Sequence, residues 1–109
     1  MVSYPRRDEV WLVALDPSKG AEIKKTQPCL IVSPDEMNEA LHTVLVAPMT
    51  TTLRNYPTRA TLTLRSKKGQ VALDQLRAID RQRLVHKLGL ISDKAADQVS
   101  NVLVEMFVR

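Results

Sequence analysis

The apolar residues of this chain fall in short runs separated by turn-forming residues, and this pattern limits the folds open to it. Residues 8–15, 29–32 and 43–47 are each dominated by apolar side chains, many of them β-branched. Runs of this length and type are typical of buried strands. Residues 58–64 instead alternate apolar and polar side chains, which predicts a strand with one exposed, basic face.

The remaining segments predict further strands and their turns. Ser66–Gly69 fits a hairpin turn. Residues 70–73 are expected to return as a fifth strand that continues, with a bend, through 74–80, and residues 84–90 form a further candidate strand. Pro28 is expected to open the second strand and Pro48 to end the third, because proline has no N–H to give to a neighbouring strand.

Two segments carry helix signals. Ser33 can cap a short helix with Pro34 at its first position, and Ser92 can cap a longer one at the end of the chain. The longer helix has an apolar stripe at helical spacing, formed by Ala96, Val99, Val102, Leu103 and Met106. We therefore predict one domain over residues 1–109: a small antiparallel β-barrel with a short helix after the second strand and a C-terminal helix.

Composition excludes several function classes. Apolar residues make up 44% of the chain and charged residues 26%, which is ordinary for a globular domain. No apolar run reaches the roughly 18 residues that a membrane span needs, and no secretory signal is visible, so a cytoplasmic protein without membrane contact is expected. Cys29 is expected to be a buried core residue, and one cysteine with two distant histidines leaves almost no ligands for structural zinc.

Positive charge is concentrated in the middle of the chain. Residues 49–87 hold nine lysines and arginines against Asp74 and Asp80, whereas the flanking segments are close to neutral. Such a segment is a candidate binding face for a polyanion, and its alternative is an ordinary solvated surface. Few aromatic side chains are present to stack on bases, so a nucleic acid would be held mainly through its phosphates.

The stretch from Pro48 to Pro57 has the chemistry of a site. Thr50, Thr51 and Thr52 follow an apolar strand directly, and Arg54 comes two residues after the last of them. Hydroxyls and a cation at the end of a rigid strand are suited to binding. Threonines at a strand end that only satisfy their own backbone are the alternative interpretation.

Motifs spread over the whole chain, in order, resemble those of MazF/PemK-type toxins. They are Trp11 with residues 16–22, residues 28–34, residues 46–51, Tyr56-Pro57 and residues 69–80. The resemblance implies an SH3-like barrel that forms a homodimer, acts without metal or other cofactor, and cleaves single-stranded RNA or mRNA at specific sequences. It also implies a small acidic, MazE-like antitoxin whose disordered tail covers the RNA groove, with contact to DNA only through the antitoxin complex.

The same resemblance implies site residues. Thr50 matches the functional threonine of the family, which donates a hydrogen bond toward the scissile phosphate. Gln27 stands where the family usually has an arginine, and a glutamine amide carries no charge and relays no proton. RNA-binding roles are implied for the following positions: Lys24, Thr51, Thr52, Arg54, Asp74, Gln75 and Arg77.

Three explanations for Gln27 stay open. Lys24 or Lys25 reaches into the site instead, the position is a disabling substitution, or other basic groups such as Arg77 or Arg54 do the work. Losing a transition-state cation costs on the order of 10²–10³ in rate.

The remaining polar candidates carry weaker signals. Ala72 replaces an arginine found in some members of the family, and Asp74 either orients a cation, contacts a base or caps backbone N–H groups. His42 and His86 match no catalytic position, so surface roles are expected for both. Lys67 and Lys68 are expected to keep a hairpin turn solvated.

Two rival functions complete the hypotheses. One is a member of the family that binds RNA or the antitoxin but cleaves weakly because of Gln27. The other is a gyrase-poisoning toxin of the same fold, which would end in Trp-Gly-Ile, whereas this chain ends Glu105-Met106-Phe107-Val108-Arg109. The missing ending counts against the second rival.

Overall fold

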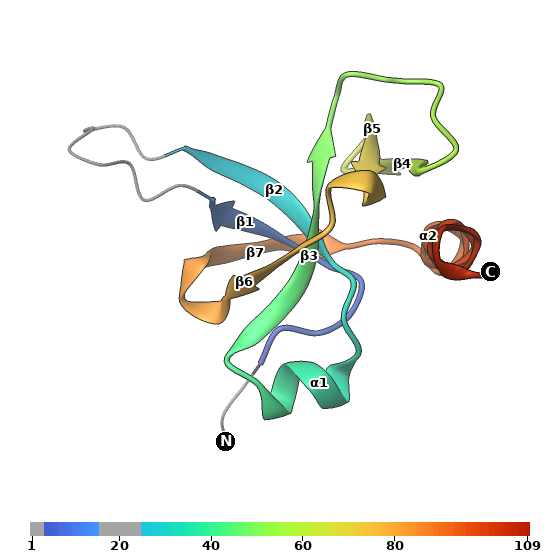
Figure 1. Cartoon of the computed structure of the whole chain (residues 1–109). Coiled ribbons are helices and arrows are strands. Elements are labelled where there is room, and N and C mark those ends of the chain that lie inside the picture. The colour runs from blue at the N-terminus through green and yellow to red at the C-terminus, as the bar shows by residue number, and fades with distance from the viewer. Residues whose placement is uncertain (1–3, 16–24) are drawn as a thin grey trace.

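The computed structural model describes residues 4–15 and 25–109, which form strands and helices in the order that the sequence predicts (Figure 1). The strands are β1 (Glu9–Ala14), β2 (Thr26–Ile31), β3 (Thr43–Thr50), β4 (Arg59–Leu64), β5 (Lys67–Ala72), β6 (Arg77–Asp80) and β7 (Leu84–Leu90). The helices are α1 (Asp35–Ala40), α2 (Asp93–Phe107) and the two short 3-10 helices η1 (Leu73–Gln75) and η2 (Arg81–Arg83).

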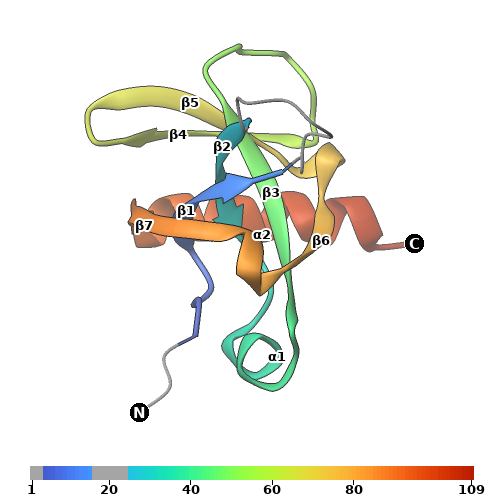
Figure 2. The same ribbon diagram turned by 90° about the vertical axis from the view of Figure 1, so that its left-hand side faces the viewer.

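The sheet is antiparallel throughout and is organised around β3. Its strand order is β4-β5-β3-β2-β1-β7, and β6 pairs with β3 beside β5. β6 pairs with the first part of β3, and β5 pairs with its last two residues. β3 therefore joins the two halves of the curled sheet (Figure 2). The predicted small antiparallel barrel with a short helix after the second strand and a C-terminal helix is confirmed.

Each face of the sheet carries its own core. Helix α2 packs across one face, where Ala95 and Val99 reach Leu30, Val71 and other buried residues. The opposite face is filled by Val13, Cys29, Ile31, Val44, Val46 and Ile79. The predicted apolar stripe of α2 is confirmed by this packing. The Ser92 hydroxyl accepts a hydrogen bond from the backbone N–H of Ala95 at 3.1 Å, which confirms its N-cap.

Both prolines lie inside strands, so the predicted strand boundaries are wrong there. Pro48 pairs with Cys29 within β3, and Pro28 pairs with Leu12 within β2. On the other edge of β3, pairing with β6 stops at Val46 and pairing with β5 begins at Met49, so Pro48 lies in the gap between two ladders. Pro28 lies where β2 has only β1 as a neighbour. A missing N–H is tolerated at such positions.

The hairpin turn between β4 and β5 also differs from its prediction. Arg65 and Ser66 form it, with φ angles of 51° and 64°, and Lys67 already begins β5. Two consecutive positive φ angles are those of a type I′ turn, which matches the twist of the flanking strands. Gly69 is not part of the turn and lies within β5. It allows β5 to approach β3 closely, because a Cβ at this position would lie 3.0 Å from the carbonyl oxygen of Thr50.

Ser33 does not cap α1 as predicted. The N-cap is Pro34, without a side-chain hydrogen bond, and the Ser33 hydroxyl accepts from the backbone N–H of Leu45 at 3.0 Å. Ser33 is buried and also donates to the Asn38 side chain, so it ties α1 to β3. In the part of the chain that the structure describes, no helix has the length and apolar content to cross a bilayer.

Candidate nucleic-acid interface

A polar hollow of about 250 Å³ opens where β2, β3, β4 and β5 converge beside η1. Its walls are Gln27, Pro48, Thr50, Thr52, Arg54, Arg59, Ala72 and Gln75. Five of these residues are among the predicted site residues: Gln27, Thr50, Thr52, Arg54 and Gln75. The structure therefore brings together residues that lie on separate segments of the sequence.

Strand register explains why these side chains share one face. Gln27 and Cys29 point to the same side of β2, because side chains alternate along a strand. Cys29 pairs with Pro48, Pro48 shares its face with Thr50, and Thr50 pairs with Gln70 of β5. The hollow is thus the open, polar end of the face whose other end holds the core around Cys29.

Thr50 ends β3 at the wall of the hollow. Its hydroxyl oxygen accepts a hydrogen bond from the backbone N–H of Thr52 at 3.1 Å. This is the local backbone contact of the alternative interpretation, yet the hydroxyl proton is not used by it and can be donated elsewhere. Both interpretations of Thr50 are therefore compatible with its geometry.

Gln27 bridges β2 and β3 beyond the end of their ladder. Its amide nitrogen donates to the carbonyl oxygen of Met49 at 3.3 Å, one residue past the last paired position, Pro48. Gln27 also borders a neighbouring hollow of about 250 Å³ that is lined by Leu15, Lys25 and Thr26. Lys25 therefore lies next to the main hollow and not in its wall, whereas Lys24 and the predicted turn at 16–20 lie outside the described residues.

Gln70 holds the loop that carries Arg54, and sequence reasoning missed it. Its side-chain oxygen accepts from the Arg54 N–H at 2.9 Å, and its amide nitrogen donates to the Arg54 carbonyl at 3.0 Å and to the Thr61 hydroxyl at 3.1 Å. Gln70 is only 6% exposed. A buried amide that satisfies both backbone groups of Arg54 fixes the position of that residue beside the hollow.

Arg59 is the second functional candidate that the sequence analysis missed. Alternation placed it on the exposed face of β4, but its side chain is only 8% exposed. Its Nε donates to the Asp74 carboxylate at 2.9 Å, and its guanidinium carbon lies 5.2 Å from the centre of the Tyr56 ring. Asp74 also accepts from the Thr58 hydroxyl at 3.2 Å. Asp74 thus holds the Arg59 cation, and a backbone N–H also donates to its carboxylate, so both the orienting role and the capping role are compatible with its geometry.

This network makes the Asp74 carboxylate harder to protonate. Partial burial raises the pKa of Asp74, but hydrogen bonds from Arg59, the backbone and Thr58, together with the Arg59 charge, outweigh it and leave the pKa below its ordinary value of 3.8. A depressed carboxyl pKa stabilises the fold above the ordinary value, and this contribution is lost as pH falls through the folded-state pKa. We expect Asp74→Asn to be less stable than wild type at neutral pH, and the gap to narrow below about pH 4. Urea unfolding at pH 7 and at pH 3 checks this, and a gap that is equal at both values would contradict it.

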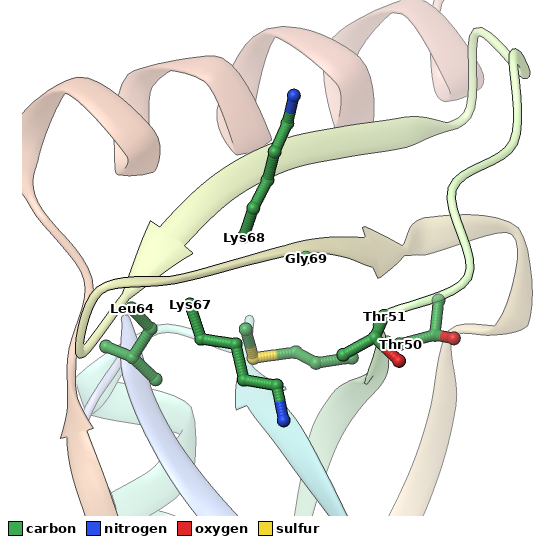
Figure 3. Close-up of a pocket in the computed structure, with 7 residues that line it drawn as sticks. Thr50, Thr51, Leu64, Lys67, Lys68 and Gly69 are labelled. Carbon is green, nitrogen blue, oxygen red and sulfur yellow. The ribbon is translucent and has the colours of Figure 1, made fainter.

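Two other predicted site residues, Thr51 and Arg77, are not in the wall of the hollow. Thr51 lines a second, apolar hollow of about 120 Å³ with Met49 and Leu64, and Thr50 borders both hollows (Figure 3). Arg77 is exposed on β6, where it pairs with Val46. Lys67 and Lys68 are the first two residues of β5, directly after the turn, and their exposed side chains point in opposite directions (Figure 3).

Cys29 and the two histidines take no part in the hollow. Cys29 is fully buried, as predicted, and burial raises the pKa of its thiol to about 12, with the Arg77 charge opposing. A thiol with such a pKa is protonated at neutral pH and inert. His42 and His86 are exposed, and neither contributes to the walls of the hollow.

Comparison with known proteins gives the family. Residues 6–107 match the PemK-like, MazF-like toxins of type II toxin–antitoxin systems. The chain belongs to this family. The endoribonuclease MazF of Staphylococcus saprophyticus is 32% identical over 104 residues, which covers 90% of this chain and 87% of that protein.

Solved structures of MazF proteins share the fold. A mycobacterial endoribonuclease in complex with its cognate antitoxin superimposes with a TM-score of 0.80 at 24% identity, covering 93% of this chain and 92% of that one. MazF from Deinococcus radiodurans gives 0.79 at 23% identity, covering 99% and 100%. A MazE–MazF structure from the same organism gives 0.79 at 23%, covering 94% of both chains. The resemblance to MazF/PemK-type toxins is confirmed.

Proposed function

We propose that this protein is the toxin of a type II toxin–antitoxin pair and cleaves single-stranded RNA at specific sequences without a metal. The observation that carries the proposal is the hollow itself, because it places the Thr50 hydroxyl, the Gln27 amide and two arginines around one space in a MazF-like chain. Hydrogen-bond donors and cations gathered in this way suit a phosphate whose negative charge increases during reaction.

The reaction we propose uses the RNA as its own nucleophile. The 2′-oxygen bonds to phosphorus and the bond from phosphorus to the 5′-oxygen breaks, which leaves a 2′,3′-cyclic phosphate and a 5′-hydroxyl. The 2′-hydroxyl loses its proton and the 5′-oxygen gains one. Thr50 donates a hydrogen bond to a phosphate oxygen and Gln27 donates a second one, while Thr52, Arg54 and Gln75 bind the RNA next to the cleaved bond.

Lys25 supplies positive charge from the neighbouring hollow. Arg77 and Thr51 bind the parts of the RNA that extend beyond the main hollow. We propose that the protein acts in the cytoplasm, because its proposed substrate, mRNA, is present there. An acidic antitoxin is the proposed partner, supported by the antitoxin complexes of the mycobacterial and Deinococcus relatives. We also propose a homodimer, which the mass of the purified protein in solution tests.

One observation favours a second function. Gln27 is neutral and already donates to the Met49 carbonyl, so a protein that binds RNA or antitoxin but cleaves weakly is the alternative. The test incubates the purified protein with a long RNA in EDTA and maps the ends of the products. We expect discrete cuts that leave 5′-hydroxyl ends. Intact RNA with wild type, but discrete cuts with Gln27→Arg, would favour the alternative.

A further inference from the structure

Arg59 has features that an ordinary surface arginine lacks. It lines the hollow, its side chain is 8% exposed, and two groups hold it. The Asp74 carboxylate takes the Nε hydrogen at 2.9 Å, and the Tyr56 ring lies 5.2 Å from the guanidinium carbon. A long, flexible side chain is thereby restricted to one position before any ligand binds.

The way in which Asp74 binds Arg59 leaves the outer part of the guanidinium unused. Within the described part of the chain, no hydrogen bond engages Nη1 or Nη2 of Arg59. These two nitrogens carry four of the five N–H donors of the side chain, in a planar fork that matches two phosphate oxygens. An arginine held through Nε can therefore still bind a phosphate through its outer edge.

The other charged group in the wall is less restricted. The Gln70 clamp fixes the Arg54 backbone, but the residue is exposed and lies in the loop between β3 and β4. Gln27, on the β2 side of the hollow, has no charge. Fixed charges stabilise a transition state more effectively than mobile ones, because they need no reorganisation when the reaction occurs.

We propose that Arg59 is the cation that binds the scissile phosphate in this chain, and that Asp74 and Tyr56 are its positioning residues. This inference rests on the proposed ribonuclease function and adds a residue to its site. Asp74 and Arg59 are 15 positions apart in sequence and meet because β4 pairs with β5 and η1 follows β5 directly.

The alternative is that the Arg59–Asp74 pair only stabilises the fold. A variant that removes the charge at position 59 and adds one at position 27 distinguishes this structural role from phosphate binding. The proteins are wild type, Gln27→Arg, Arg59→Gln, Arg59→Lys and the double variant Gln27→Arg/Arg59→Gln. Single-turnover cleavage is measured with RNA. Binding is measured with the same RNA carrying a 2′-deoxy nucleotide at the cleaved position, and thermal unfolding is followed for each variant.

We expect Arg59→Gln to lower the cleavage rate constant by about 10²–10³. Arg59→Lys should recover part of that loss, because it keeps the charge without the fork. The double variant should cleave at least about tenfold faster than Arg59→Gln, since it restores a cation to the same hollow. An arginine at position 27 does not replace the ion pair with Asp74, so a purely structural role predicts no such recovery.

Each contrary result has its own meaning. Equal cleavage by wild type and Arg59→Gln, or no recovery in the double variant, overturns the assignment of Arg59 and leaves the ribonuclease proposal intact. No cleavage by wild type or by Gln27→Arg, under conditions where both bind the deoxy-substituted RNA, overturns the ribonuclease proposal. If wild type is inactive and Gln27→Arg is active, the assignment of Arg59 is also overturned, because Arg59 alone would then be insufficient for cleavage.

Discussion

Thr50→Val is expected to lower the rate constant of RNA cleavage by about 10²–10³, the cost of removing one well-placed donor from a developing oxyanion. Valine has nearly the same shape as threonine but has no hydroxyl. Thr50 lies in the wall of the hollow with its proton available, so the loss should appear in the cleavage step. Single-turnover kinetics at saturating protein measure it directly.

Two variants control this prediction. Thr51→Val makes the same chemical change one residue later. Thr51 is not in the wall of the main hollow and is proposed only to bind RNA beyond the cleaved bond, so its cleavage rate constant at saturating protein should stay within about threefold of wild type. Thr50→Ser keeps both the hydroxyl and its bond to the Thr52 N–H, so most activity should remain. Equal losses in Thr50→Val and Thr51→Val would show that the hydroxyl of Thr50 has no special role.

Gln70→Leu is expected to destabilise the fold by about 1–3 kcal/mol and to weaken RNA binding, because it removes three hydrogen bonds at a buried position. Leucine fills a similar volume, so the main change is that Arg54 loses the partner of its N–H and carbonyl. The loop from Thr51 to Pro57 should then move more freely, and Arg54 should no longer be fixed beside the hollow. Urea unfolding and binding of the deoxy-substituted RNA measure the two effects.

The control for Gln70→Leu is the same substitution on an exposed helix face. Gln98 is exposed on α2, and Gln98→Leu should change stability by less than about 0.5 kcal/mol. If Gln70→Leu has the same urea midpoint of unfolding as wild type and binds RNA equally well, the Gln70 hydrogen bonds to the Arg54 backbone do not position Arg54.

Local patterns predicted the framework of the fold well. Alternation along 58–64 identified β4 with Ala60 and Leu62 buried, and Ser92 with the apolar stripe identified α2. The predicted strand ends were wrong where pairing between strands, and not the local sequence, decides where a strand ends. Pro48 continues β3 because it falls between two ladders, and no local signal reveals where β6 stops and β5 begins.

The site was predicted in part for the same reason. Thr50, Thr52 and Arg54 are close in sequence, so a polar stretch after a buried strand located them. Gln70 and Arg59 escaped because their roles depend on partners 15 or 16 residues away, across strand register. A glutamine or an arginine on a strand looks like solvent-facing surface until the loop and carboxylate that cover it are known.

A matched pair of RNAs tests the central claim most directly. Both carry the sequence of a mapped cleavage site, and one has a 2′-deoxy nucleotide on the 5′ side of the cleaved bond. If the substrate's own 2′-hydroxyl attacks the phosphate held in this hollow, wild-type protein binds both RNAs alike in EDTA and cuts only the all-ribose one. Cleavage of the deoxy-substituted RNA at the same bond and a similar rate would contradict the account.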